Sequence, residues 1–172
     1  ADPHLIELGY LESQGAFRDL ERFPEGHIYE GVLILRIDAP LYFANMEALQ
    51  ERIELSVSER PSLTHIILDF SGVPDLDAVA IDTFEMIIQN YNAAGIEVHF
   101  CGIRGHVRDI IRKAGWEKRF KMETRHPSVQ IVLESLGLMN RFTTIGAHQR
   151  IGLFGIRPLE DILPATTEYD DE

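Results

Sequence analysis

Four aspartates around one strand–turn–helix segment are the residues whose spacing could support chemistry. The segment, residues 68–87, reads LDFSGVPDLDAVAIDTFEMI. An apolar run ends at the first aspartate, a turn with glycine and proline follows, and a helical pattern begins among the other acids. Carboxylates at such a turn can serve as nucleophiles, as general acids or bases, or as ligands of hard cations. The four acids are Asp69, Asp75, Asp77 and Asp82.

Two phosphoryl-transfer chemistries fail on the residues present. A phosphatase of the haloacid-dehalogenase type needs Asp-x-Asp at the end of its strand, and Ser71 stands at the second acidic position. A response-regulator receiver would use Asp69 as phosphoacceptor together with an acidic pair at the first strand and a later lysine. Only Asp38 is available at the first strand, and no lysine precedes Lys113. A carboxylate site for a cation remains geometrically open.

A structural role explains these acids more simply. Asp77 can cap the following helix by accepting hydrogen bonds from its first free N–H groups, which contributes about 1 kcal/mol. Asp82 adds a favourable negative charge near the first turn, and we expect Asp75 to be solvated. The position after the cap, where a nucleophile could stand, is Ala78. We therefore predict no catalytic residue in this loop.

Outside this loop the sequence offers little further chemistry. The seven histidines show no ligand spacing, which argues against zinc, and neither common glycine-rich phosphate loop occurs. Cys101 is the only cysteine and follows an apolar run, so we expect a buried, reduced thiol. No apolar run approaches the roughly 20 residues that cross a bilayer. We predict no cofactor and no metal site.

Apolar periodicity predicts the elements that must position the loop. Asn45 is expected to cap the first helix, and the first helix is expected to follow a hairpin or bent pair of strands. The pattern predicts strands at 16–20, 32–37, 41–45, 64–70 and 96–103, and helices at 46–58, 78–94 and 106–115. This alternation predicts an α/β domain with a central mixed, largely parallel sheet, helices packed on it and an N-terminal antiparallel edge.

Packing follows from the same pattern. Phe84, Ile87 and Ile88 share one side of the helix after Asp77 and are expected to be buried against the strand that carries Ile66, Ile67 and Leu68. Gly115 is expected to end the third helix as its C-cap. Residues 129–142 repeat a helical pattern, residues 150–156 suggest a strand, and residues 157–163 suggest a short helix with proline in its first turn.

Charge is unevenly distributed along the chain. The 172 residues are 45% hydrophobic and carry a net charge of −12, which suits one domain with its own core and argues against nucleic acid as a partner. Residues 104–125 instead carry a local charge of +5. These basic side chains could meet an anionic surface or partner, or simply be solvated. The interaction patch would comprise Arg108, Arg112, Lys113, Lys118 and Arg119.

Together these features resemble a STAS domain, the fold shared by bacterial anti-sigma-factor antagonists and by the cytosolic part of SulP-family anion transporters. In the antagonists, the loop before the second long helix carries Asp-Ser-Ser/Thr-Gly, and a partner kinase phosphorylates its first serine. Asp77, Ala78, Val79 and Ala80 align with that motif and retain only the aspartate. The stretches RIDAPLYFAN and GIRGHVRDIIRKAG instead resemble the SulP branch.

The resemblance to the SulP branch implies a non-enzymatic regulatory domain of a secondary transporter of inorganic anions, of the sulfate or bicarbonate class. It implies a linker from the membrane domain with a short strand (1–30), a STAS core (31–120) and a C-terminal extension (121–172). The implied location is the cytoplasmic face of the cell membrane. The implied partners are the transmembrane domain of the same polypeptide, a second copy of the domain, or an anionic lipid surface.

Two other functions remain open. A stand-alone STAS regulator of the antagonist type would bind a kinase or sensor by partner switching. A small-molecule module would hold an anion or nucleotide at the free N–H groups where the second long helix begins, although the nearby carboxylates oppose an anion there. In each case the regulatory loop at the STAS switch position comprises Asp77, Ala78, Val79, Ala80 and Asp82.

Overall fold

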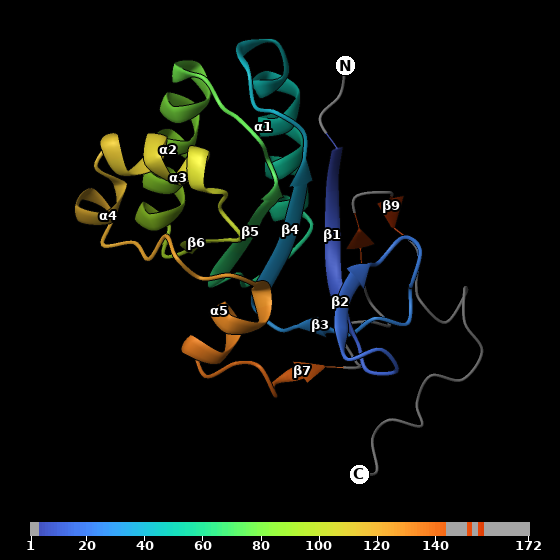
Figure 1. Ribbon diagram of the computed structural model, residues 1–172. Helices are drawn as coiled ribbons and strands as arrows, with labels where there is room; N and C mark the ends of the chain where they lie inside the picture. The colour runs from blue at the N-terminus through green and yellow to red at the C-terminus, as the bar shows by residue number, and fades with distance from the viewer. Residues whose placement is uncertain (1–3, 144–150, 153–154, 157–172) are drawn as a thin grey trace.

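The computed structural model describes residues 4–143, 151–152 and 155–156 (Figure 1). In chain order the elements are β1 (His4–Leu11), β2 (Ala16–Asp19), β3 (Ile28–Tyr29), β4 (Val32–Asp38), α1 (Phe43–Ser58), β5 (His65–Gly72), α2 (Ala78–Ala93), β6 (Glu97–Cys101), α3 (Gly105–Lys113), α4 (Trp116–Arg119), α5 (Val129–Ser135), β7 (Phe142–Thr143), β8 (Ile151–Gly152) and β9 (Gly155–Ile156).

The central sheet is mixed, as predicted. Strands β4, β5 and β6 pair in parallel and form its centre. β1 pairs antiparallel with β4, and β2 pairs antiparallel with β1, so the N-terminal antiparallel edge is confirmed. β3 and β7 extend the sheet with further antiparallel pairs. Among the described residues β6 pairs only with β5, which leaves β6 at the other edge of the sheet.

Each face of the sheet carries its own apolar core. One core joins alternate strand residues to α1, α2, α3 and α4, and these helices gather on one side of the sheet in Figure 1. The other core lies against α5 and includes the buried Cys101 thiol. Strand neighbours point to opposite faces, so Ile66 and Leu68 meet α2, whereas Ile67 lies on the α5 side.

The predicted strand at 41–45 does not form. Leu41 makes a single bridge with Leu76, and α1 begins at Phe43 with Tyr42 as its N-cap rather than Asn45. Asn45 lies inside the first turn, where its side chain accepts a hydrogen bond from the Tyr42 N–H (3.0 Å). A hairpin with β4 is excluded because β5 occupies one edge of β4 and β1 the other.

The N-terminal thirty residues contain three strands instead of the single short strand expected. β1 was missed because Glu7 interrupts its apolar pattern; the structure buries this side chain in an ion pair with Arg60. β1 runs directly beside β4, with His4 opposite Asp38. The division of the chain at residue 30 stays a prediction, and the strands on both sides of it share one sheet.

The C-terminal part follows the prediction only in outline. α3 has Ala114 as its C-cap, and Gly115 follows with a left-handed φ of 80°, so the expected glycine lies one position later. α5 ends at Ser135, well before residue 142. The strand expected at 150–156 is instead the antiparallel pair β8 and β9. The short helix expected at 157–163 lies outside the described residues. None of the helices described is both long and apolar enough for a bilayer.

Candidate functional site

The loop before α2 is fixed by Asp77, which bridges the first turns of two helices. Its Oδ1 accepts a hydrogen bond from the Ala80 N–H of α2 (2.9 Å), and its Oδ2 accepts one from the Phe43 N–H of α1 (2.8 Å). The predicted cap is therefore confirmed. These backbone hydrogen bonds hold the pKa of Asp77 below its usual range, because they favour the charged carboxylate. Asp77 is an ionised anchor whose two oxygens are both engaged.

Asp75 ties three elements together and is not the free, solvated acid that the sequence suggested. The Tyr42 hydroxyl donates to Asp75 Oδ2 (2.9 Å), and His106 Nε2 lies 2.9 Å from Asp75 Oδ1. The hydrogen bond from Tyr42, followed by that with His106, holds the pKa of Asp75 below its usual range. Backbone hydrogen bonds of Leu41 with the residues on both sides of Leu76 hold the same segments together. The starts of α1, α2 and α3 are thus linked at one end of the domain.

Beside these anchors lies an exposed apolar surface, which we call the switch face: Tyr42, Phe43, Ala78 and Val79. The exposed fractions are 73% for Phe43 and 42% each for Tyr42 and Val79, and Ala78 is also exposed. Large apolar side chains that stay exposed in a small cluster mark an interaction surface more often than a lone exposed one does. The face presents a methyl group, and no hydroxyl, at the position where the antagonist motif has serine.

The regulatory loop predicted from sequence divides into inward and outward residues. Ala80 is fully buried and Asp77 is engaged by backbone donors, whereas Ala78, Val79 and Asp82 are exposed. The structure therefore brings all five residues into the first turns of α2. Sequence reasoning missed Tyr42, Phe43 and His106, which reach this site from α1 and α3. The adjacent aromatic residues at the start of α1 are a sequence signal for Tyr42 and Phe43, whereas His106 has no such signal.

The four aspartates do not form a cation site within the described part of the chain. Asp69 lies within β5, where its Oδ1 accepts from the Ser71 N–H (2.9 Å). The one group of three metal-competent side chains found among the described residues does not include any of the four. Asp69, Asp75 and Asp77 accept hydrogen bonds from nearby backbone N–H groups of turns and caps.

The predicted basic patch is largely paired internally. Arg119 makes a two-pronged ion pair with Glu85, with N–O distances of 2.9 and 3.0 Å. Arg112 Nε donates to Glu117 (2.7 Å), and Arg108 Nη2 donates to the Ile103 carbonyl (3.0 Å). These pairs lie on and beside α3 and α4. The three arginines are therefore engaged with partners inside the domain.

The remaining patch residues are Lys113 and Lys118, both exposed. They are the only two of the five for which no ion pair or side-chain hydrogen bond is found within the described residues. Any attraction to an anionic partner would rest mainly on these two ammonium groups. Two of the five predicted patch residues are thus left to attract an anionic partner.

One known domain family covers most of this chain. The family profile described as "STAS domain" matches residues 24–142. "Probable sulfate transporter 4.2" of Arabidopsis thaliana is 30% identical over 125 residues, which are 67% of this chain and 18% of that protein. The chain spans about a fifth of the length of the curated relatives it matches.

Solved structures show the same fold at lower identity. The murine Solute Carrier 26 family member A9 anion transporter aligns with a TM-score of 0.70 and 21% identity, covering 78% of this chain and 22% of that one. The SulP transporter STAS domain from Vibrio cholerae aligns with a TM-score of 0.52 and 20% identity, covering 69% of this chain and 91% of that one.

Proposed function

Because the chain belongs to the STAS domain family, we propose that it is the regulatory and interaction domain of a SulP-type secondary transporter of inorganic anions. The similarity to a protein named as a sulfate transporter supports sulfate as the substrate class of the whole protein, with bicarbonate as the alternative. In this proposal the domain lies at the cytoplasmic face of the membrane and has no catalysis of its own. Its principal partner is the transmembrane domain of the same polypeptide.

The observation that carries this proposal is the switch face. Asp77 caps α2 at the position that aligns with the antagonist motif, and Ala78 lacks the hydroxyl that a kinase would need. Phe43 and Val79 instead offer apolar area beside it, and burial of apolar area is the main driving force of most protein association. The face therefore suits contact with another protein surface more than covalent switching.

A small-anion site at the start of α2 is less well supported. Asp77 already accepts from the Ala80 N–H, and its charge and that of Asp75 lie where the anion would bind. These negative carboxylates would repel a bound anion. The helix terminus is therefore occupied from within the chain.

Anion uptake by the full-length protein tests the proposal. Labelled sulfate and bicarbonate uptake would be measured with and without this domain, and with Phe43→Asp combined with Val79→Asp. We expect deletion and the double variant to reduce uptake of one of the two anions. Leu55→Asp is the matched control, because Leu55 is an exposed apolar residue (49%) at the far end of α1.

Surface abundance of each variant must be measured alongside uptake. Equal uptake of both anions by the intact protein, the deletion and the double variant would refute the proposal. A loss in Leu55→Asp as large as that in the double variant would show that the switch face has no special role.

A further inference from the structure

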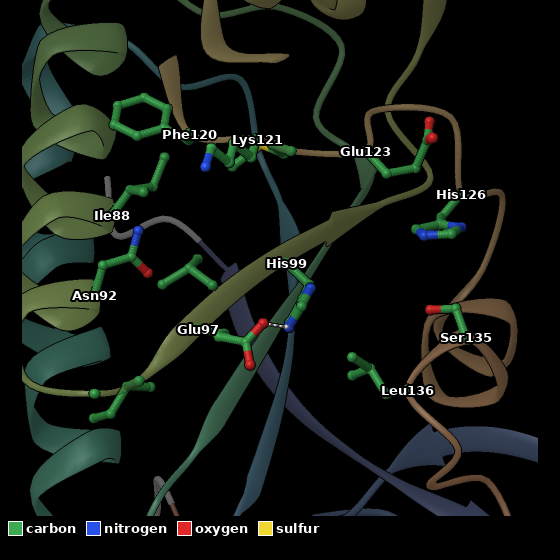
Figure 2. A pocket seen from close by; sticks show the side chains of 14 residues that line it. Ile88, Asn92, Glu97, His99, Phe120, Lys121, Glu123, His126, Ser135 and Leu136 are labelled. Atoms are coloured by element: carbon green, nitrogen blue, oxygen red, sulfur yellow. Dashed lines mark ion pairs between the residues drawn. The ribbon is translucent and has the colours of Figure 1, made fainter. Parts of the chain in front are cut away.

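Parallel pairing of β5 and β6 gathers two histidines and a glutamate on one face of the sheet. His65 begins β5, and its partner in the register is Glu97, the first residue of β6. His99 follows two positions later on β6 and therefore points to the same face as Glu97. Figure 2 shows the side chains of Glu97 and His99 directed toward one another at the edge strand.

The ligand atoms of these three side chains converge. Glu97 Oε2 lies 3.3 Å from His65 Nε2, and Glu97 Oε1 lies 3.7 Å from His99 Nε2. One potential ligand atom from each residue can be chosen so that all lie within 4.8 Å of one another. The two imidazole rings stack with a centroid separation of 5.5 Å. Small rotations suffice to bring three such atoms onto one ion with bonds of about 2.0–2.2 Å.

Thr64 contacts the ring nitrogen of His65 other than the one nearest Glu97. Its hydroxyl oxygen lies 3.2 Å from the Gly31 carbonyl oxygen and 2.8 Å from His65 Nδ1. When the hydroxyl donates to Gly31, Nδ1 donates to Thr64 and Nε2 of the neutral ring directs its lone pair toward Glu97. This is the outer hydrogen bond that commonly orients a metal-binding imidazole.

The side chain of His99 lacks a hydrogen-bond partner for one ring nitrogen. Its Nε2 is buried and has no hydrogen-bond partner, although Glu97 stands nearby. The Nε2 atoms of both imidazoles therefore face one carboxylate, an arrangement that a cation between them would satisfy.

A pocket of about 550 Å³ gives access to this group. Glu97 and His99 line it, together with Glu123 and His126 from the segment before α5 and with Ser135 at the end of α5 (Figure 2). The exposure of Glu97 leaves one side of the group open to water. An ion could enter from the pocket and keep a water molecule as a further ligand.

We propose that His65, Glu97 and His99 form a binding site for a divalent transition-metal ion, with zinc as the preferred ion. Two imidazoles and one carboxylate are a zinc ligand set, whereas calcium and magnesium favour oxygen ligands throughout. The bound ion joins the edge strand β6 to β5 beside the pocket. The histidines show no ligand spacing along the chain because two different strands supply them.

Zinc titration of the chelator-treated 172-residue chain tests this site. Isothermal calorimetry is expected to show one zinc per chain, and cobalt is expected to give the visible absorption of a four-coordinate site with nitrogen ligands. His65→Gln and His99→Gln should each abolish both signals. Thr64→Val should weaken zinc binding by about 10- to 100-fold, as loss of an orienting partner does. His106→Gln is the matched control and should bind as the unaltered chain does.

Circular dichroism of each variant checks that it is folded. Absence of zinc binding by the unaltered chain would overturn the proposal, as would unchanged zinc binding by a folded His65→Gln/His99→Gln double variant. Loss of binding in His106→Gln would place the ion at Asp75 instead, which also overturns it.

Discussion

Single side chains decide whether this loop is a reactive switch. Ala78 places a methyl group where an antagonist would carry its phosphorylated serine. Two other hydroxyl groups of the segment do not stand at the position of Ala78. The Thr83 hydroxyl donates to the Val79 carbonyl (2.9 Å), and Ser71 lies near the end of β5. The cap geometry of Asp77 is nevertheless retained. Under the proposed function, the loop would therefore act without a phosphate acceptor at Ala78.

A serine kinase of the anti-sigma type should therefore leave the loop unphosphorylated. Mass spectrometry after kinase treatment is expected to find no phosphate in residues 68–87, whereas Ala78→Ser would supply the missing acceptor and is the positive control. Phosphate on Ser71 or Thr83 of the unaltered chain would contradict this prediction.

Removal of the Asp77 cap should destabilise the domain. Asp77→Ala is expected to lower the free energy of unfolding in urea by about 1 kcal/mol at pH 7. The folded-state pKa of Asp77 is lowered, so its contribution is present above the unfolded-state pKa and is lost as pH falls through the folded-state value. The difference between the two proteins should shrink correspondingly in acid. Asp82→Ala, at an exposed position of α2, is the control and should change stability little.

Among the secondary-structure elements, helix α2 connects the loop at Asp77 to the hydrophobic core. Its inner residues Phe84, Ile87 and Ile88 are buried, as predicted, and Phe84 packs edge-on against Phe70 and Phe100 of the sheet with centroid distances of 5.4 and 6.2 Å. The start of α2 is thus held by a rigid packing surface. Any partner that binds the switch face meets a preformed surface.

Ile88→Ala should cost about 2–5 kcal/mol in unfolding free energy, because it opens a cavity at a side chain that is 1% exposed. Met86→Ala changes a neighbouring α2 residue that is 53% exposed, and it should cost far less. Urea unfolding of both variants measures the difference. Substitutions of this kind lower the unfolding free energy by at least about 2 kcal/mol. A loss of unfolding free energy below about half a kcal/mol for Ile88→Ala would therefore show that the inner face of α2 is wrongly assigned.

The whole molecule separates its charges. It carries −12 overall and +5 over residues 104–125, yet most of the arginines in that basic stretch are used inside the domain. Arg119 pairs with Glu85 on α2 and thereby fastens α4. Of the five patch residues, Lys113 and Lys118 are the ones that could face acidic lipid headgroups or, under the proposed function, an acidic patch on the transporter core. Such attraction weakens with salt, since the Debye length is about 8 Å at physiological ionic strength.

Charge reversal at Lys113 and Lys118 should leave the domain folded and reduce anion uptake by the full-length protein, most strongly at low salt. Adding Arg112→Gln should change uptake little further, because Arg112 is already engaged with Glu117 inside the domain. Arg119→Glu serves as the contrast and should lower thermal stability, because it places a like charge against Glu85. Unchanged uptake at both low and physiological salt would leave these lysines as solvated side chains only.

The sequence by itself determined the elements whose signals are local. Strands with continuous apolar runs, the amphipathic α2 and its Asp77 cap were predictable because neighbouring residues alone specify them. The basic stretch and the missing hydroxyl at Ala78 were equally visible. The resemblance then supplied the fold, since RIDAPLYFAN was recognisable as a pattern even though its last residues were misread as a strand.

Only the tertiary structure decided which distant residues meet. In β1, the buried Glu7 is paired with Arg60, a residue far along the chain. The Phe43 N–H donates a hydrogen bond to Asp77, 34 residues away. His65 reached Glu97 only through the parallel register of β5 and β6. Parallel strands are joined by long crossovers, so their register leaves no periodic signal along the chain. Sites built across such strands appear only when the sheet is assembled.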